Sequence, residues 1–398
     1  MKIAARPHSP NGRIRSMKIA CISASQVPSA TANSIQAMKV CQSLAQTGNE
    51  VCLWLPGRQA ASWPALAEQY GLETPFEMRW LPSHSRLRRY DFAWGALRQA
   101  RAWGAQAVYT WVFQAGLMAL WQGLPLLLEL HDRPSGRVGP WLFRQIANYP
   151  GKKALLFITR ALQQALENEL HIQLRPGEAV VAPDGVDLER YTALPEPAEA
   201  RRLLGLPQGL TAGYTGHLYL GRGADLLVRL AAAFPGVRFL WVGGRPADVE
   251  YWRARTAELG LGNVLLTGFV PNQRIPLYQA AAEILLMPYE AVITGSSGGN
   301  TVDICSPMKM FEYMAAGRAI LSSDLPVLHE VLTPASAVFC PPPPEGEEEW
   351  KAAFGGLIAD AGLRQRLSQQ ACEDAARYDW VSRARYSLEG FDGLAKTQ

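Results

Sequence analysis

Short apolar runs alternate along the chain with longer segments in which apolar residues recur at helical spacing. This alternation is typical of βαβ units, which build parallel sheets covered by helices. The predicted strands form two series. The first contains residues 18–22, 51–55, 107–111, 126–130 and 154–158, with a last strand and turn in 178–187, and the second contains 211–215, 238–242, 264–268, 284–288 and 319–323.

The order of these elements predicts two domains. A single hydrophobic core stops growing near roughly 250–300 residues, and this chain has 398. We expect residues 194–200 (LPEPAEA) to link two doubly wound α/β domains. Residues 340–350 (CPPPPEGEEEW) are expected to form a solvated loop, and residues 378–391 to close the chain as an amphipathic helix.

Composition limits the class of protein. Hydrophobic residues make up 48% of the chain and charged residues 19%, as in ordinary globular proteins. The six cysteines form no CxxC pair and no Cys/His zinc spacing, so we expect no disulfide framework, no metal and a cytoplasmic location. Because no uninterrupted apolar run reaches about 18 residues, we expect no membrane-spanning helix.

The N-terminus repeats itself, since MKIA at positions 1–4 returns at 17–20. The residues between the repeats are polar and lack the apolar core of a secretory signal. We expect residues 1–16 to be a flexible extension and the fold to begin at Met17.

The net charge of +4 is too small to indicate a nucleic-acid-binding protein. The charge is unevenly distributed, because residues 86–104 hold five arginines and one aspartate. Phe92, Trp94 and Trp103 lie among these arginines on an expected helix. Two interpretations stay open: a helix resting on an anionic membrane surface, or a solvated amphipathic helix with buried tryptophans.

Residues able to do chemistry follow four predicted strands, at the edge where ligands bind in open α/β sheets. They are His131, Asp132 and Arg133 after 126–130, Gly216, His217, Arg222 and Gly223 after 211–215, Gly243, Gly244 and Arg245 after 238–242, and Glu290 with the glycine-rich segment 294–300 after 284–288. Each residue alone has an ordinary structural explanation. Their recurrence in both series predicts a ligand site between two domains.

The segment 306–317 is predicted to be a helix, with Ser306 as its N-cap, Pro307 in its first position and Gly317 at its end. Lys309 then lies at the positive end of the helix dipole, which is unfavourable by about 0.3–1 kcal/mol. It either pairs with Glu312 one turn later or meets a bound anion. Together with Arg222 and Arg245, it could hold a diphosphate without a metal ion.

Two nucleotide-binding fingerprints are missing. Gly221-Arg-Gly223 lacks the third glycine of the dinucleotide motif, and no Walker A loop occurs. The sequence therefore argues against a nicotinamide oxidoreductase and against ATP hydrolysis.

Five segments together resemble the retaining glycosyltransferases of family 4. They are VAPDGVD (181–187), YTGHLYLGRGADLL (214–227), FLWVGG (239–244), NVLLTGFVPNQRIPLYQAAAEILLMPY (263–289) and SPMKMFEYMAAGRAILSSDLPVLHEVL (306–332). The resemblance implies a GT-B fold, with two Rossmann-like domains, a cleft between them and a final helix that crosses back. It implies an acceptor domain at 17–187 completed by 378–398, and a donor domain at 188–377.

The resemblance also implies roles for individual residues. Glu312 would bind the ribose of the donor, Arg222 and Lys309 its diphosphate, and His131 would lie near the sugar. His131, Arg222 and Lys309 are therefore the expected catalytic residues. The remaining expected donor-binding residues are Gly216, His217, Gly243, Arg245, Val270 and Ser306, and Asn33 and Asp303 are expected near the sugar or acceptor.

The sequence departs from the family pattern at three places. His217 replaces a family arginine, and Ile304 replaces a glutamate eight positions before Glu312, where Asp303 could substitute. The loop from Ser29 to Asn33 matches the family's glycine-rich loop only loosely.

The implied activity is hexosyl transfer from a UDP- or GDP-linked sugar to a hydroxyl group, without metal or cofactor. The expected partners are a nucleotide sugar and a glycan or lipid-linked acceptor, in polysaccharide or glycolipid assembly at the inner face of the cell membrane. Two alternatives stay open: a nucleotide-sugar-binding protein of the same fold without transfer activity, suggested by Ile304 and His217, and a GT-B nucleotide-sugar epimerase.

Overall fold

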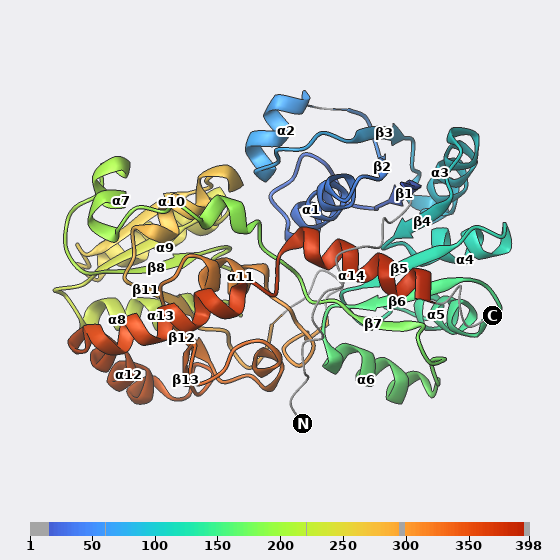
Figure 1. Ribbon diagram of the computed structural model, residues 1–398. Helices are drawn as coiled ribbons and strands as arrows, with labels where there is room; N and C mark the ends of the chain where they lie inside the picture. The colour runs from blue at the N-terminus through green and yellow to red at the C-terminus, as the bar shows by residue number, and fades with distance from the viewer. Residues whose placement is uncertain (1–15, 60, 220, 294–298, 394–398) are drawn as a thin grey trace.

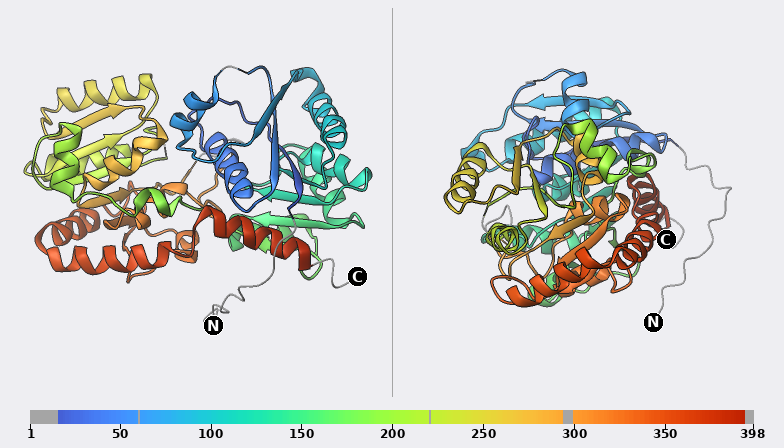
Figure 2. Two further views of the ribbon diagram at one scale, coloured as in Figure 1. Left: turned by 45° about the horizontal axis from the view of Figure 1, so that its top comes forward. Right: turned by 90° about the vertical axis from the view of Figure 1, so that its left-hand side faces the viewer.

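The computed structural model describes residues 16–59, 61–219, 221–293 and 299–393. Figure 1 shows two lobes, each a parallel sheet with helices around it, and Figure 2 shows these lobes from two further sides. We call the lobe built from the first part of the chain the first domain and the other lobe the second domain. The predicted extension at 1–16 and the glycine-rich segment 294–300 lie mostly outside the described residues.

The first domain is built on a seven-stranded parallel sheet with the order β3-β2-β1-β4-β5-β6-β7. Its strands are β1 (Lys18–Ile22), β2 (Glu50–Pro56), β3 (Glu77–Leu81), β4 (Ala107–Thr110), β5 (Leu126–Leu130), β6 (Lys153–Phe157) and β7 (Ala179–Val181). Its helices are α1 (Ala32–Gln46), α2 (Trp63–Tyr70), α3 (Tyr90–Trp103), α4 (Phe113–Trp121), α5 (Val138–Asn148) and α6 (Arg160–Leu170), with a 3-10 turn η1 (Ser85–Leu87). β5 reads LLLEL and is buried throughout, because helices cover both faces of such a sheet.

The second domain is built on a six-stranded parallel sheet with the order β10-β9-β8-β11-β12-β13. Its strands are β8 (Thr211–Thr215), β9 (Arg238–Val242), β10 (Val264–Gly268), β11 (Ile284–Met287), β12 (Ala319–Ser323) and β13 (Val338–Cys340). Its helices are α7 (Pro197–Leu204), α8 (Ala224–Ala233), α9 (Pro246–Glu258), α10 (Ile275–Ala280), α11 (Met308–Ala315), α12 (Glu347–Ala359) and α13 (Ala361–Ala375), with 3-10 turns η2 (Leu188–Tyr191), η3 (Asn272–Arg274) and η4 (Pro326–Glu330). In both sheets the strand order reverses beside the first strand of the series, β1 or β8, and ligands of open α/β sheets bind at such a reversal.

The chain crosses between the domains twice, and the two crossings touch each other. Val186 and Asp379 form an isolated parallel bridge. Helix α14 (Trp380–Gly393) then packs against α1 and β6 of the first domain (Figure 1, red). The predicted return of the final helix to the first domain is therefore confirmed, and we propose that the domain boundaries at 187/188 and 377/378 lie at these crossings.

Four expectations about local structure were wrong or incomplete. β3 and β13 were not predicted, because the sequence EMRWL carries a glutamate and an arginine and β13 has three residues. The expected linker 194–200 is partly helical, since α7 begins at Pro197. The expected loop 340–350 ends early, because α12 begins at Glu347, where three successive glutamates favour a helix N-terminus.

Candidate active site

Two glycine loops meet where the second sheet reverses. Gly216 follows β8 with a φ of 137°, and its N–H donates to the carbonyl of Val242 at 2.8 Å. A Cβ added at Gly243 would lie 2.5 Å from the carbonyl oxygen of Gly216. A Cβ added at Gly216 would lie 2.8 Å from Nζ of Lys309. Glycine at both positions permits this close approach, so the structure brings three predicted residues together: Gly216, Gly243 and Lys309.

Lys309 lies in the first turn of α11 and is partly buried. Its Nζ lies 4.0 Å from the ring centroid of Tyr214 and 5.4 Å from that of Tyr289. Burial, and then the charge of Arg222, hold the pKa of Lys309 well below its ordinary value. Within the described ranges Lys309 forms no ion pair, so the alternative of a pair with Glu312 is not realised. A partly buried cation at a helix N-terminus is suited to binding an anion.

The start of α11 corrects one prediction. The helix begins at Met308, and Pro307 takes the cap position with extended backbone angles (φ −75°, ψ 121°). Ser306, the expected cap, is therefore displaced one residue outward, and its buried Oγ has no hydrogen-bond partner among the described residues. The end of the helix is as predicted, since Gly317 follows it with a φ of 59°.

Tyr219 holds two arginines at this site. Cζ of Arg222 lies 5.0 Å from the Tyr219 ring centroid and 5.4 Å from that of Tyr289, and Nη2 donates to the Tyr219 hydroxyl at 2.9 Å. Cζ of Arg245 lies 5.1 Å from the Tyr219 ring, and its Nε lies 3.6 Å from a carboxylate oxygen of Asp248. The charge of Arg222 therefore remains available to a ligand, whereas that of Arg245 is partly offset.

His217 lies beside these cations. Burial, and then the charges of Lys309 and Arg222, lower the pKa of His217, while the backbone of Ala30 in the first domain opposes the shift. Its Nδ1 is buried without a hydrogen-bond partner in the described part of the chain. The imidazole that replaces a family arginine is therefore held neutral, and it adds a polar atom rather than a charge.

Glu312, one turn after Lys309 on α11, forms a second part of the site. Its Oε2 accepts a hydrogen bond from Nε2 of Gln279 at 3.1 Å, and burial raises its pKa. Glu312 shares a small cavity with Lys39, Asp187 and Arg190. Lys39 pairs with Asp187, which Arg190 also contacts at 3.2 Å. These polar groups were not predicted from the sequence; the signal for them is that lysine and glutamine fall on the buried face of α1.

His131 lies on the first-domain side, directly after β5. Its Nε2 lies 2.8 Å from Oε1 of the fully buried Glu129. Burial alone would lower the pKa of His131, but the hydrogen bond and charge of Glu129 raise it above its ordinary value. One ligand atom each of Glu129, His131 and Asp184 lie within 4.8 Å of one another. The carboxylate of Glu129 is already paired with Arg383 of α14.

Asp303 and Ile304 join the two domains. The carboxylate of Asp303 accepts two hydrogen bonds from Arg133, at 3.1 and 2.7 Å. The side chain of Ile304 has no exposed surface and belongs to the apolar core of the first domain. The hydroxyl of Thr159 donates to its carbonyl at 3.0 Å. Asp303 is thus held by an arginine, and Ile304 faces away from any polar ligand.

The remaining predicted residues lie at the edges of this arrangement. Val270 follows β10 and packs with Val242 and Ala280 in a buried cluster. Asn33 is exposed in the first turn of α1. The structure therefore groups Gly216, His217, Arg222, Gly243 and Lys309, with Glu312 one turn further on.

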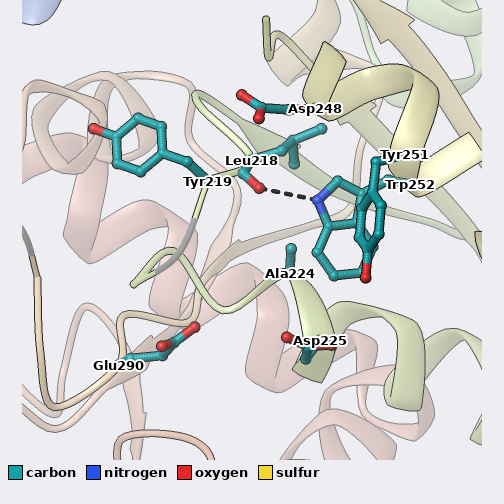
Figure 3. A pocket seen from close by; sticks show the side chains of 8 residues that line it. All are labelled: Leu218, Tyr219, Ala224, Asp225, Asp248, Tyr251, Trp252 and Glu290. Atoms are coloured by element: carbon teal, nitrogen blue, oxygen red, sulfur yellow. Dashed lines mark hydrogen bonds between the residues drawn. The ribbon is translucent and has the colours of Figure 1, made fainter.

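A separate cavity of about 330 Å³ lies beside this group (Figure 3). Tyr219, Tyr251 and Trp252 line it together with three carboxylates, Asp225, Asp248 and Glu290. None of the predicted donor-binding residues lines it. Because its carboxylates would repel a diphosphate, we place the candidate site at the glycine loops and α11 instead.

Comparison with known proteins gives a consistent result. The family model described as Glycosyl transferases group 1 matches residues 209–360. The chain is 28% identical over 291 residues to the 2-deoxystreptamine glucosyltransferase of Streptomyces kanamyceticus, covering 64% of this chain and 68% of that protein. It is 24% identical over 362 residues to the phosphatidyl-myo-inositol mannosyltransferase of Mycolicibacterium smegmatis, covering 86% and 85%.

A solved structure extends the likeness to the whole fold. The Anabaena protein HepE in complex with UDP-glucose superposes with a TM-score of 0.73 at 17% identity, over 95% of this chain and 100% of that one. Both parallel sheets and the returning helix α14 are those of a GT-B fold. Residues 209–360 therefore match the group 1 glycosyltransferase family model, and the chain as a whole has the GT-B fold.

Proposed function

We propose that the chain transfers a hexose, with retention of anomeric configuration, from a UDP- or GDP-linked donor to a hydroxyl group of a glycan or lipid-linked acceptor. The proposal rests mainly on the pair of cations Arg222 and Lys309. Both cations lie at the glycine loops and the start of α11, and neither forms an ion pair within the described residues. A bound diphosphate would supply the negative charge that these two cations lack. The names of the two relatives, a glucosyltransferase and a mannosyltransferase, support a hexose.

The UDP-glucose complex of the similarly folded HepE supports a nucleotide-sugar donor. In the proposed reaction the acceptor oxygen bonds to the anomeric carbon on the face from which the diphosphate leaves. The departing phosphate oxygen takes the acceptor proton. The protein contributes positioning and charge stabilisation: Glu312 orients the ribose, Arg222 and Lys309 stabilise the leaving diphosphate, and His131 orients the sugar. Because two side-chain cations meet the diphosphate, we propose that no metal is required.

The test begins with donor binding. UDP, GDP, ADP, CDP and NAD are compared by thermal shift, because a ligand at 100 times its dissociation constant stabilises by about 2.7 kcal/mol. We expect the largest shift with UDP or GDP; a shift with NAD alone would contradict the proposal. Arg222→Ala should then lower transfer sharply without lowering the melting temperature. Arg253→Ala, at an exposed arginine of α9, is the matched control and should do neither.

One observation favours a second candidate. Ile304, at the position of a family glutamate, is buried in the first domain and cannot contact the sugar. A nucleotide-sugar-binding protein without transfer activity would show the UDP or GDP shift but form no product with any acceptor. An epimerase would instead form product from the donor alone, so product analysis with and without acceptor separates the three functions.

We also propose that the first domain binds an anionic membrane surface. Trp94 of α3, Trp121 of α4 and Trp141 of α5 are 59%, 59% and 51% exposed. α3 packs against α4 and α4 against α5, on the side of the first domain away from the second (Figure 1). The exposed arginines on or beside these helices are Arg86, Arg88, Arg89, Arg98, Arg101, Arg137 and Arg144. Exposed tryptophans among arginines suit the interface of an anionic bilayer.

This surface differs from the one predicted from residues 86–104 alone. Phe92 is buried, and Trp103 is only partly exposed and packs on Trp54 with ring centroids 5.8 Å apart. Only Trp94 of the three predicted aromatics is exposed. Within the described residues no helix combines the length and apolarity needed to cross a bilayer.

Sedimentation with lipid vesicles tests the proposed membrane contact. Each arginine near an anionic surface contributes about 1 kcal/mol, so Arg98→Gln with Arg101→Gln should weaken binding to anionic vesicles by about thirtyfold. Replacing Trp94, Trp121 and Trp141 by serine should weaken it further. Equal binding to zwitterionic and anionic vesicles, or no binding by the unaltered chain, would contradict the proposal.

A further inference from the structure

One buried carboxylate, Glu129 of β5, gathers polar groups from several elements of the first domain. Nη2 of Arg383 on α14 donates to its Oε1 at 2.6 Å, and Nε2 of His131 lies 2.8 Å from the same oxygen. Gln36 of α1 and Tyr109 of β4 also donate to the carboxylate. The side chain of Glu129 has no exposed surface, so these contacts replace its hydration entirely.

Arg383 is itself held firmly. Its Nε donates to the carbonyl of Pro183 at 2.7 Å, and Nη2 donates to that of Ala182 at 3.0 Å. Its Cζ lies 5.4 Å from the ring centroid of Trp380, and its side chain is 6% exposed. Both carbonyls belong to the segment that leaves the first domain, and Arg383 belongs to the helix that returns to it. The returning helix therefore fixes the carboxylate that contacts His131.

We propose that Glu129 and Arg383 are positioning residues for His131, fixing Nε2 on the carboxylate so that Nδ1 is the ring nitrogen left to meet the substrate. This inference rests on the proposed function, since the orientation of His131 affects transfer only if the sugar lies beside it. A carboxylate that orients an imidazole in this way also sets its protonation.

The charges around His131 determine how it titrates. They are Glu129 on β5, Asp184 on the crossing segment and Arg383 on α14, with the Tyr109 hydroxyl close by. Despite the cost of burial, Arg383 and the hydrogen bonds of the cluster lower the pKa of Glu129 to about 2, so it stays ionised. Burial works against protonation of His131, but Glu129 and Asp184 outweigh it and raise its pKa. Removing the charge of Glu129 should therefore lower it.

The first experiment measures the titration of His131 directly. The full chain labelled with ¹⁵N-histidine contains six histidines, and His131→Asn identifies the signal of His131. We expect Nε2 to carry a proton at neutral pH and the ring to titrate above about 6.5. In Glu129→Gln the titration should move to lower pH. If it does not move, the proposal is overturned. This measurement does not depend on sugar transfer, so it stands even if the proposed function fails.

The second experiment is a mutant cycle on transfer. Glu129→Gln should lower kcat by about 10- to 100-fold, by analogy with the loss when the partner that orients a metal-ligating histidine is removed. The dissociation constant for UDP or GDP should stay unchanged, because Glu129 does not lie at the donor loops. In a His131→Ala background the same substitution should have no further effect on kcat. An equal loss in both backgrounds would mean that Glu129 acts only on the fold.

Three further variants separate positioning from stability. Arg383→Lys keeps the charge and should retain more activity than Arg383→Gln. Glu178→Gln is the matched control, because Lys153 and Glu178 form another buried ion pair of the same sheet, at 2.8 Å. It should lower the melting temperature but leave the pH profile of kcat unchanged. Glu129→Gln should move the pH profile of kcat to lower pH, as it moves the titration of His131. An equal shift in Glu178→Gln would overturn the proposal.

Discussion

Replacing Lys309 by methionine should separate function from stability. Methionine keeps an unbranched side chain of similar length and removes the charge. In the structure the ammonium group is partly buried, lies on the Tyr214 ring and has no carboxylate partner among the residues described. A cation held in this way costs stability when the site is empty and is useful only when an anion binds. We therefore expect lower activity together with an equal or higher melting temperature.

The loss of activity can be sized from the proposed contact. A hydrogen bond to a charged group is worth about 1.5–3 kcal/mol. Since about 1.4 kcal/mol corresponds to a factor of ten, kcat/KM should fall by about 10- to 150-fold in Lys309→Met. The loss should appear with every acceptor, because Lys309 is proposed to meet the donor diphosphate.

The gain in stability should depend on pH. Burial and Arg222 lower the pKa of Lys309 in the folded protein, whereas in the unfolded chain it is near 10.5. The folded state therefore binds this proton less tightly than the unfolded state does, and stability rises with pH between the two pKa values. The advantage of Lys309→Met should be full below the folded-state pKa and should fade as the pH approaches 10.5.

Thermal unfolding without ligand and initial rates of transfer provide the assay. Lys351→Met is the matched control, because Lys351 pairs with Glu347 and Glu348 at 2.8 Å on α12. It should lower the melting temperature slightly and leave transfer unchanged, which is the opposite pattern. If Lys309→Met destabilises the protein at neutral pH while kcat/KM stays constant, Lys309 has a structural role and the reasoning is refuted.

Three further predictions follow from the same contacts. Burial raises the pKa of Glu312 above its ordinary value of 4.5, and only the carboxylate form can accept hydrogen bonds from both ribose hydroxyls. The affinity for the donor, measured by isothermal titration calorimetry, should therefore fall as the pH drops through this raised pKa. The affinity of Glu312→Gln should show no such pH dependence. Ile304→Ala should destabilise by about 2–5 kcal/mol in denaturant unfolding, whereas Ile304→Val should cost about 0.5–1.5 kcal/mol; equal small losses would contradict its placement in the core. Asp303→Asn removes an exposed pair with Arg133 and should cost only about 0.2–1 kcal/mol in the same assay.

The fold was largely predictable because both sheets are parallel and buried. Strands covered on both faces read as continuous apolar runs, and all of the predicted runs are strands in the structure. β3 was missed for the same reason, since it lies at the sheet edge and has no fully buried residue. The cap of α11 was misplaced because the prediction assumed a proline inside the first turn, whereas Pro307 stands just outside it.

The candidate site was predictable where its residues follow strands or start helices. Gly216, Gly243 and Lys309 come from three such places, and the structure groups them. Contacts between distant segments could not be predicted in this way. Glu129 and Arg383 are 254 positions apart in the chain, and no local pattern connects them.

The interface around Ile304 shows how the two domains are joined. The hydroxyl of Thr159 donates to the Ile304 carbonyl, and Glu330 of the second domain accepts hydrogen bonds from the N–H groups of Arg160 and Ala161 at 2.7 and 2.8 Å. Glu330 thus satisfies donors at the start of α6 that have no partner within that helix. These contacts link the start of α6 to the loop before α11 and to η4.

Ile304 therefore has a different role from the glutamate that the resembled family has at this position. A glutamate there would bring a charge into the apolar core of the first domain, which is unfavourable unless the charge is paired. The segment that carries a sugar-binding carboxylate in the resembled family instead holds the domains together in this chain. In the proposed reaction, contact with the donor sugar would then fall to neighbouring groups. Asp303 is occupied by Arg133, whereas His131 keeps one ring nitrogen away from Glu129, and so His131 is the stronger candidate to determine which sugar is bound.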